Sequence, residues 1–509
     1  MFNSRNSCNM FRHRINIALL SLGVLLFLSC SSSENEKVTF TLLQLNDVYE
    51  IAPLDNGKTA GLARVATIRQ QLIAENPNTI SLLSGDFLSP SLIGNLKYNG
   101  ERIKGKQMVE VLNAVGLDYV TFGNHEFDIS EEDLQKRLDE STFKWVSCNT
   151  FQKKDSTYAP FEVNGQPIPM FQIHQVKYES GSTLKIGIIG ITLPFNKADY
   201  VYYTAFYDSF KKTYDQIKSQ CDLVVALTHI DIDDDLKLAE MFPDLLIILG
   251  GHDHINMKHQ VGNVVVSKAD ANAKTVYAHR ISFDPVNKTT NIMSELIPID
   301  ENVLENPEVK SIVDKWEKIS SDNLSGLGYN PDRLVFTTQD TLDVWESSVR
   351  NHPTNFTNMV LESMIFANNT VDAAILNSGS IRLDDILFGD IYEFDILKTF
   401  PYGGPLVITQ MDGDKLTKII NIGTIDNIDT GGYLQLKNLE RRGDKWYVSN
   451  SPIESKKVYT VMMPKFLADG NEQNLEFLKG ISYSLPEALG PNKVKNDIRD
   501  LFIDYKRTP

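Results

Sequence analysis

Short apolar segments alternate with longer amphipathic segments through the first half of the chain. Runs rich in β-branched residues predict strands, whereas apolar residues spaced three or four apart predict helices. Predicted strands cover 38–45, 79–83, 119–122, 145–148, 184–191, 223–227 and 245–249, and predicted helices cover 61–75, 106–115, 130–140 and 234–241. Because strands and helices alternate, the pattern alone predicts an α/β domain with an open, doubly wound sheet.

The pattern changes near Asp300, where a charged and helix-prone segment begins. It carries Ile312, Trp316 and Ile319 on one stripe, and we interpret it as a linker between domains. Two domains are the usual organisation for a chain of 509 residues. We expect them over 38–300 and 331–509, joined by a helical linker over 301–330. The first element predicted in the second domain is a helix over Asn355–Ala367, and a strand follows over Asp372–Leu376.

The N-terminus has the pattern of a targeting segment. Arg5, Arg12 and Arg14 precede an apolar run from Ile17 to Leu28. That run is shorter than the roughly 20 residues of a membrane-spanning helix, so 1–29 reads as a signal peptide. Its end resembles a bacterial lipoprotein signal cut before a lipid-modified Cys30; an ordinary secretory signal is the alternative.

With that modification, the mature protein would be exported and attached to a membrane by its lipid anchor only, in the periplasm or on the cell surface. Residues 30–37 would form a flexible polar tether. The other two cysteines of the mature chain are Cys148 and Cys221, next to predicted buried strands. We expect them to be small core residues, with a single disulfide as the alternative.

The net charge of −16 argues against a nucleic-acid partner, which requires a basic surface. Small anionic substrates are still compatible with it, because bound cations reverse the local field.

Candidate ligands for such cations follow the predicted strands. They are Asp47, Asp86, Asn124, His125, His229, His252 and His254. Ligand sites of α/β sheets lie at the carboxyl ends of strands. Carboxylate, amide and imidazole groups together suit Zn, Mn or Fe. Each residue alone is more often a turn former or a structural histidine, but the set exceeds one open metal site and suits two metals that share a bridge.

Two neighbouring metals stabilise the attacking and leaving oxygens of a phosphoryl displacement. His125 could give or take a proton, and Asp128, three residues later, could hold its imidazole. The sequence therefore predicts a dinuclear phosphatase centre with a proton-transfer pair.

Five short motifs carry a resemblance to a known family. They are Asn46-Asp47, Ser84-Gly85-Asp86, Gly123-Asn124-His125-Glu126, Thr228-His229 and Gly251-His252-Asp253-His254. In this order they resemble the calcineurin-like metallophosphoesterases, specifically the 5′-nucleotidase family with its extra C-terminal domain, over nearly all of 38–509. The resemblance implies two domains. The first is a four-layered α/β/β/α metallophosphatase domain, in which helices flank a β-sandwich, and the second is an α+β C-terminal substrate domain.

The resemblance also implies roles for the motif residues. Asp86 would bridge two divalent metal ions, Zn, Mn or Fe. Asp47 and His254 would complete one metal site, and Asn124, His229 and His252 the other. His125 would stabilise or protonate the transition state, with Asp128 orienting its ring. The nucleophile would be a metal-activated water.

One position departs from the family pattern. The first motif of the family is Asp-x-His, where this chain has Asp47-Val48-Tyr49. The first metal is thus one imidazole short. Three interpretations follow: the site is more open and holds another water, which we prefer; Tyr49 coordinates and favours a ferric ion; or the metal binds weakly and activity is low.

The C-terminal domain resembles the substrate-recognition domain of the family. Asn377, Gly379 and Arg382 lie in its Asn377-Ser378-Gly379-Ser380-Ile381-Arg382 motif, where the arginine would contact the substrate phosphate. Tyr433 matches an aromatic residue that stacks on the nucleobase; the alternative is a core tyrosine. A further family arginine is missing from 421–432, and the family's second stacking turn is replaced by Ala468-Asp469-Gly470-Asn471-Glu472.

These features predict a phosphomonoesterase that acts on nucleoside 5′-monophosphates or related nucleotides. The reduced base site keeps a second substrate class open, namely a sugar phosphate. The Tyr49 departure keeps a third function open, namely a non-catalytic lipoprotein that binds phosphate or nucleotide. The sequence does not predict the oligomeric state.

Overall fold

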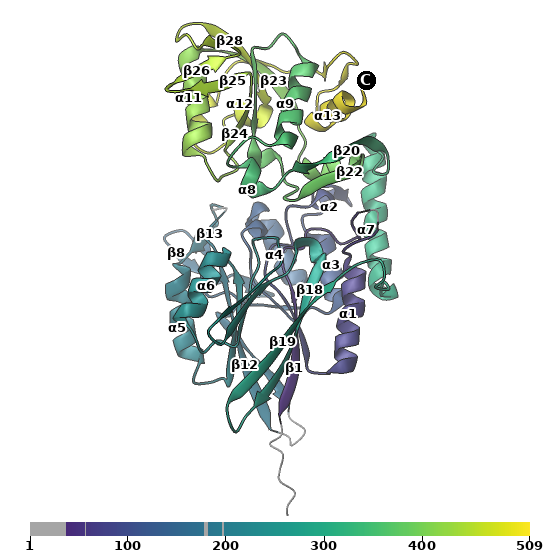
Figure 1. The fold of residues 1–509 in the computed structure, drawn as a ribbon, viewed down its shortest axis with the longest axis vertical. Helices are drawn as coiled ribbons and strands as arrows, with labels where there is room; N and C mark the ends of the chain where they lie inside the picture. The colour runs from purple at the N-terminus through teal and green to yellow at the C-terminus, as the bar shows by residue number, and fades with distance from the viewer. Residues whose placement is uncertain (1–36, 56, 178–181, 196–197, 509) are drawn as a thin grey trace, which may run out of the picture.

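The computed structural model describes residues 37–508 except 56, 178–181 and 196–197 (Figure 1). The predicted signal peptide, Cys30 and nearly all of the tether lie outside the described residues. Within the described part of the chain, every helix is too short or too polar to cross a membrane. Cys148 is buried, Cys221 is partly buried, and both are free thiols.

The first half of the described chain forms two six-stranded sheets with the strand orders β19-β18-β1-β2-β5-β6 and β11-β12-β14-β15-β17-β16. The strands of the first sheet are β19 (Thr289–Pro298), β18 (Thr275–Asp284), β1 (Val38–Leu45), β2 (Thr79–Leu83), β5 (Tyr119–Val120) and β6 (Lys144–Trp145). Those of the second are β11 (Phe171–Lys177), β12 (Thr183–Thr192), β14 (Leu223–His229), β15 (Ile247–Leu249), β17 (Val264–Lys268) and β16 (Met257–Val261). The central strands of each sheet are parallel, and antiparallel strands complete the edges.

The two sheets pack face to face. Phe40 and Leu42 of β1 belong to a buried cluster that also contains Ile188 of the second sheet, whereas Leu43 and Leu45 point to the opposite side, toward helices. Successive side chains alternate between faces, so a strand buried on both faces reads as one apolar run. The result is the four-layered α/β/β/α domain that the resemblance implied.

The open sheet expected from alternation alone is therefore wrong. Helices cover only one face of each sheet, and the other apolar face has to pack against a second sheet. Alternation along the sequence does not reveal to which sheet each strand belongs. Helices α1 (Leu62–Glu75), α3 (Lys106–Val115), α4 (Glu131–Glu140) and α7 (Pro307–Gly326) lie on the first sheet's side, and α5 (Phe206–Ile217) and α6 (Ile232–Met241) on the second's (Figure 1).

Local signals placed several of these helices well. Helix α3 has the predicted bounds, and α4 begins as predicted after Ser130, whose Oγ accepts a hydrogen bond from the Asp133 amide at 3.2 Å. Helix α7 is more than a linker, because it packs on α1 and α3. Its buried face contains Val309, Val313 and Trp316. Of the predicted stripe, Trp316 is therefore buried, whereas Ile312 and Ile319 are half-buried.

The second half of the chain contains a five-stranded sheet in the order β24-β21-β28-β23-β29. Its strands are β24 (Leu434–Lys437), β21 (Ala373–Asn377), β28 (Val458–Pro464), β23 (Leu406–Asp412) and β29 (Tyr483–Ser484). The accompanying helices are α8 (Glu346–Val349), α9 (Asn355–Ala367), α10 (Glu393–Thr399), α11 (Gly413–Asn421), α12 (Lys465–Ala468) and α13 (Ile498–Arg507). Helix α9 has its predicted bounds.

The expectation that this domain opens with a helix is wrong. Its first element is β20 (Leu334–Asp343), which pairs with β22 (Ile386–Tyr392). This pair of strands has irregular register, and half of the β20 side chains are exposed. An exposed strand lacks the apolar alternation by which strands are predicted.

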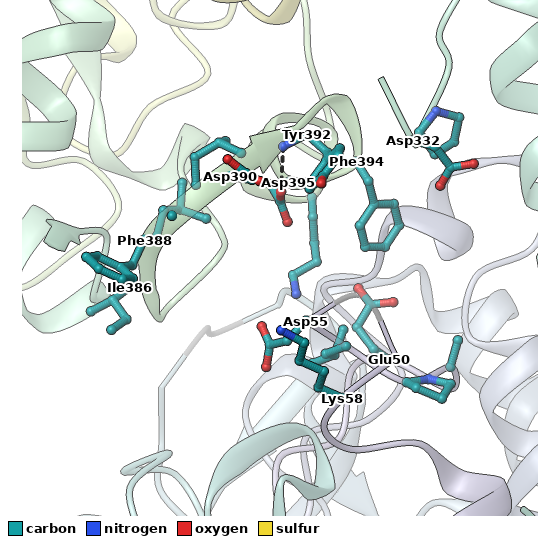
Figure 2. A pocket seen from close by; sticks show the side chains of 18 of the residues that line it. Glu50, Asp55, Lys58, Asp332, Ile386, Phe388, Asp390, Tyr392, Phe394 and Asp395 are labelled. Carbon is teal, nitrogen blue, oxygen red and sulfur yellow. Dashed lines mark hydrogen bonds between the residues drawn. The ribbon is translucent and has the colours of Figure 1, made fainter. Parts of the chain in front are cut away.

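A cavity of about 490 Å³ lies where the two halves meet (Figure 2). Its walls come from Glu50, residues 52–55 and Lys58 of the first half, and from β22 and α10 of the second. Burial raises the pKa of Glu50, which lines it, to about 7. None of the predicted strand-end ligands lines this cavity.

We expect Trp316→Ala to lower the free energy of unfolding by about 3–5 kcal/mol, as for other fully buried tryptophans. The ring is 0% exposed, packs edge-on to Tyr98 at 5.2 Å between ring centroids, and donates its N–H to Glu110. Urea denaturation of the variant measures the loss. Leu327→Ala, at a side chain 54% exposed beside the end of α7, is the control. Equal losses in the two variants would contradict the docked role of α7.

Candidate metal centre

The predicted strand-end residues gather at one edge of the sandwich. The loops after β1, β2 and β5 come from the first sheet, and those after β14 and β15 from the second. The ring of His229 faces the first sheet, with Nδ1 2.7 Å from the Ser84 carbonyl oxygen, and Ser84 Oγ donates to the Leu249 carbonyl at 2.9 Å. These contacts bring residues far apart in sequence into one cluster.

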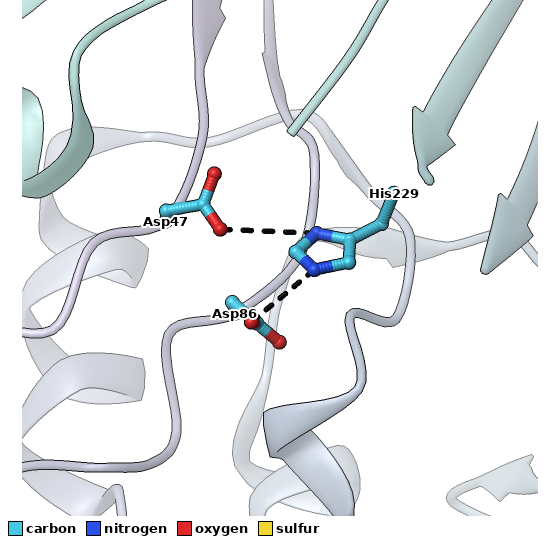
Figure 3. Close-up of side chains that lie close together, drawn as sticks. All are labelled: Asp47, Asp86 and His229. Atoms are coloured by element: carbon cyan, nitrogen blue, oxygen red, sulfur yellow. Dashed lines mark ion pairs between the residues drawn. The ribbon is translucent and has the colours of Figure 1, made fainter. Parts of the chain in front are cut away.

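Asp47, Asp86 and His229 form the centre of the cluster (Figure 3). They are 0–1% exposed, and each offers a ligand atom within 4.8 Å of the others. His229 Nδ1 faces the Ser84 carbonyl oxygen and carries a proton, which leaves Nε2 directed inward. Nε2 lies 3.2 Å from Asp86 Oδ2 and 3.1 Å from Asn124 Oδ1.

This geometry fits a bound cation. The Nε2 nitrogen of His229, a carboxylate oxygen and an amide oxygen face one another, so the site between them favours positive charge, either a proton on Nε2 or a metal ion in its place. Burial alone would lower the pKa of His229, but the charges of Asp86 and Asp47 outweigh burial and raise that pKa to about 9. The cluster therefore stabilises positive charge, as a metal centre built from oxygen and nitrogen ligands must.

The two remaining histidines occupy different positions. His254 Nε2 lies 3.3 Å from Asp47 Oδ1, inside the cluster. His252 is at the rim: its amide donates to Asp47 Oδ2 at 2.9 Å, and its Nε2 faces Asp231 at 3.4 Å. The structure thus brings Asp47, Asp86, Asn124, His229 and His254 together and places His252 beside them, its ring 5.3 Å from that of His229 between centroids.

Four of these residues have left-handed backbone conformations. The φ angles are 52° for Asp47, 56° for Asp86, 84° for His252 and 59° for His254. Such conformations are rare outside glycine and cluster at functional sites, where the surrounding structure maintains them. The strand ends are therefore shaped to direct ligands inward at some cost in backbone energy.

Two features hold Asp86 in place. Glu126 accepts hydrogen bonds from the amides of Asp86, Phe87, Leu88 and Gly123 at 2.6–3.1 Å. Gly123 passes so close to Asp86 that a Cβ there would lie 2.0 Å from Oδ1. The glycine in the Gly123-Asn124-His125-Glu126 motif is thus required by the close approach of two loops.

His125 and Asp128 form the predicted pair. His125 Nδ1 lies 2.7 Å from Asp128 Oδ2, and both residues lie on one 3₁₀ turn, His125–Asp128. Arg382 of the C-terminal half donates from Nη2 to the same carboxylate oxygen at 2.8 Å. Of the four predicted substrate residues, Arg382 therefore contacts the His125–Asp128 pair.

The other three substrate residues lie together in the C-terminal half. The amide of Gly379 donates to the Gly431 carbonyl at 2.7 Å, and the amide of Ser378 donates to the Tyr433 carbonyl at 2.9 Å. Asn377 donates to Glu472 at 2.9 Å. Tyr433 is only 7% exposed.

Several residues at the site have no motif in the sequence. Asp384 contacts His254 Nδ1 at 2.5 Å, and Glu346 lies 3.6 Å from Arg382 and forms an ion pair with the buried Arg350. Burial and the nearby charge of Arg382 lower the pKa of Arg350 to about 9. Only the position of Asp384, two residues after Arg382, could have suggested a role.

Two family models match the chain in separate segments. Residues 40–256 match the calcineurin-like phosphoesterases, and residues 335–479 match the 5′-nucleotidase C-terminal domain. The chain belongs to the calcineurin-like phosphoesterases that carry a 5′-nucleotidase C-terminal domain. It is a hydrolase of the 5′-nucleotidase type.

Known proteins agree with this assignment. The phosphoesterase is 25% identical to human 5′-nucleotidase over 89% of this chain and 86% of that protein. It is 27% identical to the Bacillus subtilis trifunctional nucleotide phosphoesterase protein YfkN over 77% of this chain, but spans only 28% of that protein's length. A 5′-nucleotidase precursor from Thermus thermophilus has the same fold, with a TM-score of 0.70, 20% identity, and coverage of 92% of this chain and 96% of that one.

A buried lysine connects the loops that carry the histidines of the phosphoesterase. Lys268 is 0% exposed, and its Nζ donates to the carbonyls of Ile230 at 2.6 Å and Gly251 at 2.8 Å. It also forms ion pairs with Asp235 at 3.0 Å and with Asp253. Ile230 follows His229, and Asp253 lies between His252 and His254, so one ammonium group ties the two histidine loops together.

We expect Lys268→Met to destabilise the protein by about 3–5 kcal/mol, because it leaves the buried carboxylate of Asp235 and the partly buried one of Asp253 without their cation. Denaturant unfolding, followed by intrinsic fluorescence, measures the change. Lys211→Met is the matched control, since Lys211 forms an exposed ion pair with Asp215, and removal of an exposed pair has little effect. A Lys268→Met protein as stable as the Lys211→Met protein would contradict the connecting role of Lys268.

Proposed function

We propose that this protein is an exported, dinuclear-metal phosphomonoesterase that hydrolyses nucleoside 5′-monophosphates or related nucleotides. The observation that carries the proposal is the position of Arg382 and the His125–Asp128 pair beside a cluster of buried metal-type ligands. A phosphate recognised by the guanidinium would lie next to both the proton donor and the cluster. Relatives named 5′-nucleotidase support the substrate class.

Asp86 would be shared by the two metal ions. Asp47 and His254 would hold one ion, and Asn124, His229 and His252 the other. Divalent ions there would supply positive charge for the phosphoryl oxygens and make water a usable nucleophile near neutral pH. The oxygen and nitrogen ligands indicate the class of ion, namely Zn, Mn or Fe.

The side chains of the protein would perform the remaining steps. Asp128 accepts a hydrogen bond from the Nδ1–H group of His125 and fixes the orientation of the ring. The Nε2–H group of the protonated ring could then protonate the leaving oxygen. Arg382 offers two parallel N–H groups to the phosphate oxygens, the geometry in which a guanidinium binds phosphate most strongly. Arg350 and Glu346 hold the arginine region in place.

A sugar phosphate is the second candidate substrate, and one observation favours it. Tyr433 is only 7% exposed and offers little ring surface to a base. In addition, Asn377 is engaged with Glu472. Phosphate recognition is well developed at this site, whereas base recognition would rest on one buried aromatic ring.

Export is supported by the sequence from Arg5 to Cys30, with its basic start, short apolar run and candidate lipidation site. An exported phosphatase anchored through Cys30 would act on phosphate esters outside the cytoplasm.

One prediction from the proposed function concerns the chemistry. With Mn or Zn added, the protein should hydrolyse a generic aryl phosphate, and His125→Ala should lower kcat at least about 100-fold, the size of a lost general acid. Steady-state kinetics measure both. His174→Ala is the control. His174 lies on strand β11, where it is hydrogen-bonded to Tyr119, and it does not belong to the cluster. Metal-independent turnover, or equal losses in both variants, would disprove the assigned mechanism.

The second prediction concerns the substrate. AMP should be hydrolysed with a kcat/KM at least about 10-fold above that of ribose 5-phosphate, since stacking of a base on an aromatic ring contributes about 1–3 kcal/mol. Tyr433→Ala should remove this preference and leave ribose 5-phosphate hydrolysis unchanged. Tyr447→Ala, on the separate strand β26 (Lys445–Val448), is the control. Equal turnover of the two substrates by the wild type would favour the sugar phosphatase.

A further inference from the structure

The cavity between the two halves of the protein is strongly acidic, and the proposed function does not use it. None of the candidate metal ligands and none of the four predicted substrate residues lines it. Its lining contains six carboxylates and two ammonium groups, those of Lys58 and Lys398. A hollow lined mainly by charges of one sign concentrates ions of the opposite sign. The carboxylates belong to Glu50, Asp55, Glu317, Asp332, Asp390 and Asp395.

Glu50 is a buried carboxylate that faces this cavity without a partner. The residue is 5% exposed, and within the part of the chain that the structure describes no hydrogen bond or ion pair reaches its carboxylate. Figure 2 shows the side chain extending from the first half toward Phe394 on the opposite wall. A buried charge is costly unless it is paired, so the cavity has room for a cation exactly where Glu50 lacks one.

The charges around Glu50 agree with this picture. Burial raises the pKa of Glu50 to about 7; the charge of Lys398 opposes that rise, and the charge of Glu317 adds to it. The ammonium group of Lys398 lies too far away to form an ion pair with Glu50 in the described structure. The surroundings of Glu50 therefore contain less positive charge than its carboxylate requires.

The remaining lining suits the carbon chain of an organic cation. Ala52, Pro53 and Leu54 contribute apolar groups on one wall, and Phe394 contributes an aromatic ring on the other. Aromatic faces attract ammonium groups, and methylene groups pack on apolar surface. The volume of about 490 Å³ is that of a small-molecule site, since such sites span roughly 300–1,000 Å³.

The acids of the cavity are too widely spaced to hold a single metal ion. Among the described residues, the acids and histidines whose ligand atoms gather in a group of three within 4.8 Å are Asp47, Asp86 and His229, outside this cavity. The cavity acids come instead from separate elements: Glu317 lies on α7 and Asp395 on α10. Carboxylates spread over both walls match several ammonium groups held apart by methylene chains.

We propose that this cavity binds an aliphatic polyamine, with one ammonium group paired with Glu50 and the others paired with acids of the opposite wall. A polyamine bound in this way contacts both halves of the protein. The site is independent of the phosphatase chemistry, because it shares no residue with the candidate metal centre.

Titration of the full chain with spermidine, followed by calorimetry at an ionic strength of about 0.15 M, tests the proposal. At this ionic strength, attraction by exposed charges is largely screened. We expect one spermidine per chain. Glu50→Gln preserves the shape of the side chain and removes its charge, so it should weaken binding at least about 10-fold, as expected for a lost charged hydrogen bond. Glu162→Gln, at an exposed residue of β9 (Glu162–Val163) outside the cavity, is the control and should bind as the wild type does.

Lys398→Met tests the sign of the electrostatic effect. Loss of an ammonium group from the cavity should strengthen spermidine binding about threefold or more, because the cavity becomes more negative. Thermal unfolding without spermidine shows whether each variant is folded, and Glu50→Gln should be at least as stable as the wild type, since a buried unpaired charge is removed.

Three outcomes would overturn the proposal. The first is no binding of spermidine by the wild type. The second is binding of the same strength by Glu50→Gln, which would indicate attraction to the acidic surface in general. The third is weaker binding by Lys398→Met, which would make Lys398 part of the site and not a competitor of the ligand.

Discussion

The burial of two carboxylates at the common edge of two sheets is the constraint on which the rest of the structure depends. Asp47 and Asp86 are 0% and 1% exposed, and a buried charge is costly unless it is paired and hydrogen-bonded. Their surroundings supply what burial removes: the His125 amide donates to Asp86 at 2.8 Å, and the His252 amide donates to Asp47. In addition, His229 faces both acids and His254 faces Asp47. The two acids and the histidines that face them make the cluster a candidate metal site, because they favour positive charge at the centre.

The sandwich is the simplest way to meet this constraint. A single parallel sheet brings its strand ends to one line, but two packed sheets bring them to a shared edge from both sides. Lys268 bonds to the Gly251 carbonyl in the loop of His252 and His254, and Glu126 bonds to the amide of Asp86, so left-handed residues are held on both sides of the sandwich. The C-terminal half adds Arg382 and Asp384, each of which contacts a histidine or its partner.

The sequence was sufficient wherever structure depends on near neighbours. Helices α3 and α9 and the Ser130 cap follow from local spacing, and the strand-end positions of the candidate ligands follow from apolar runs that stop at polar residues. Local patterns could not show that the strands divide between two sheets, that the exposed β20 is a strand, or that α7 packs on the first domain. Lys268 and Asp384 were missed for the same reason. Each contacts residues that are distant from it in sequence, and neither belongs to a motif. The number and identity of bound ions depend on how the ligand atoms are arranged in space, which a pattern of residues along the chain does not specify.

Recognition of phosphate and recognition of a base place different demands on the fold. A phosphate needs fixed positive charge, which under the proposed function would come from Arg382, held against Asp128, and from cations bound at the cluster. A base needs exposed apolar surface on both of its faces, and Tyr433 is enclosed by its own domain. Because Arg382 and Tyr433 belong to the same C-terminal half but only Arg382 reaches the cluster, substrate choice depends on how much of the Tyr433 ring a bound molecule can uncover. Under the proposed function, the chemistry would thus depend on the buried centre, and selectivity for a base on the exposure of the Tyr433 ring.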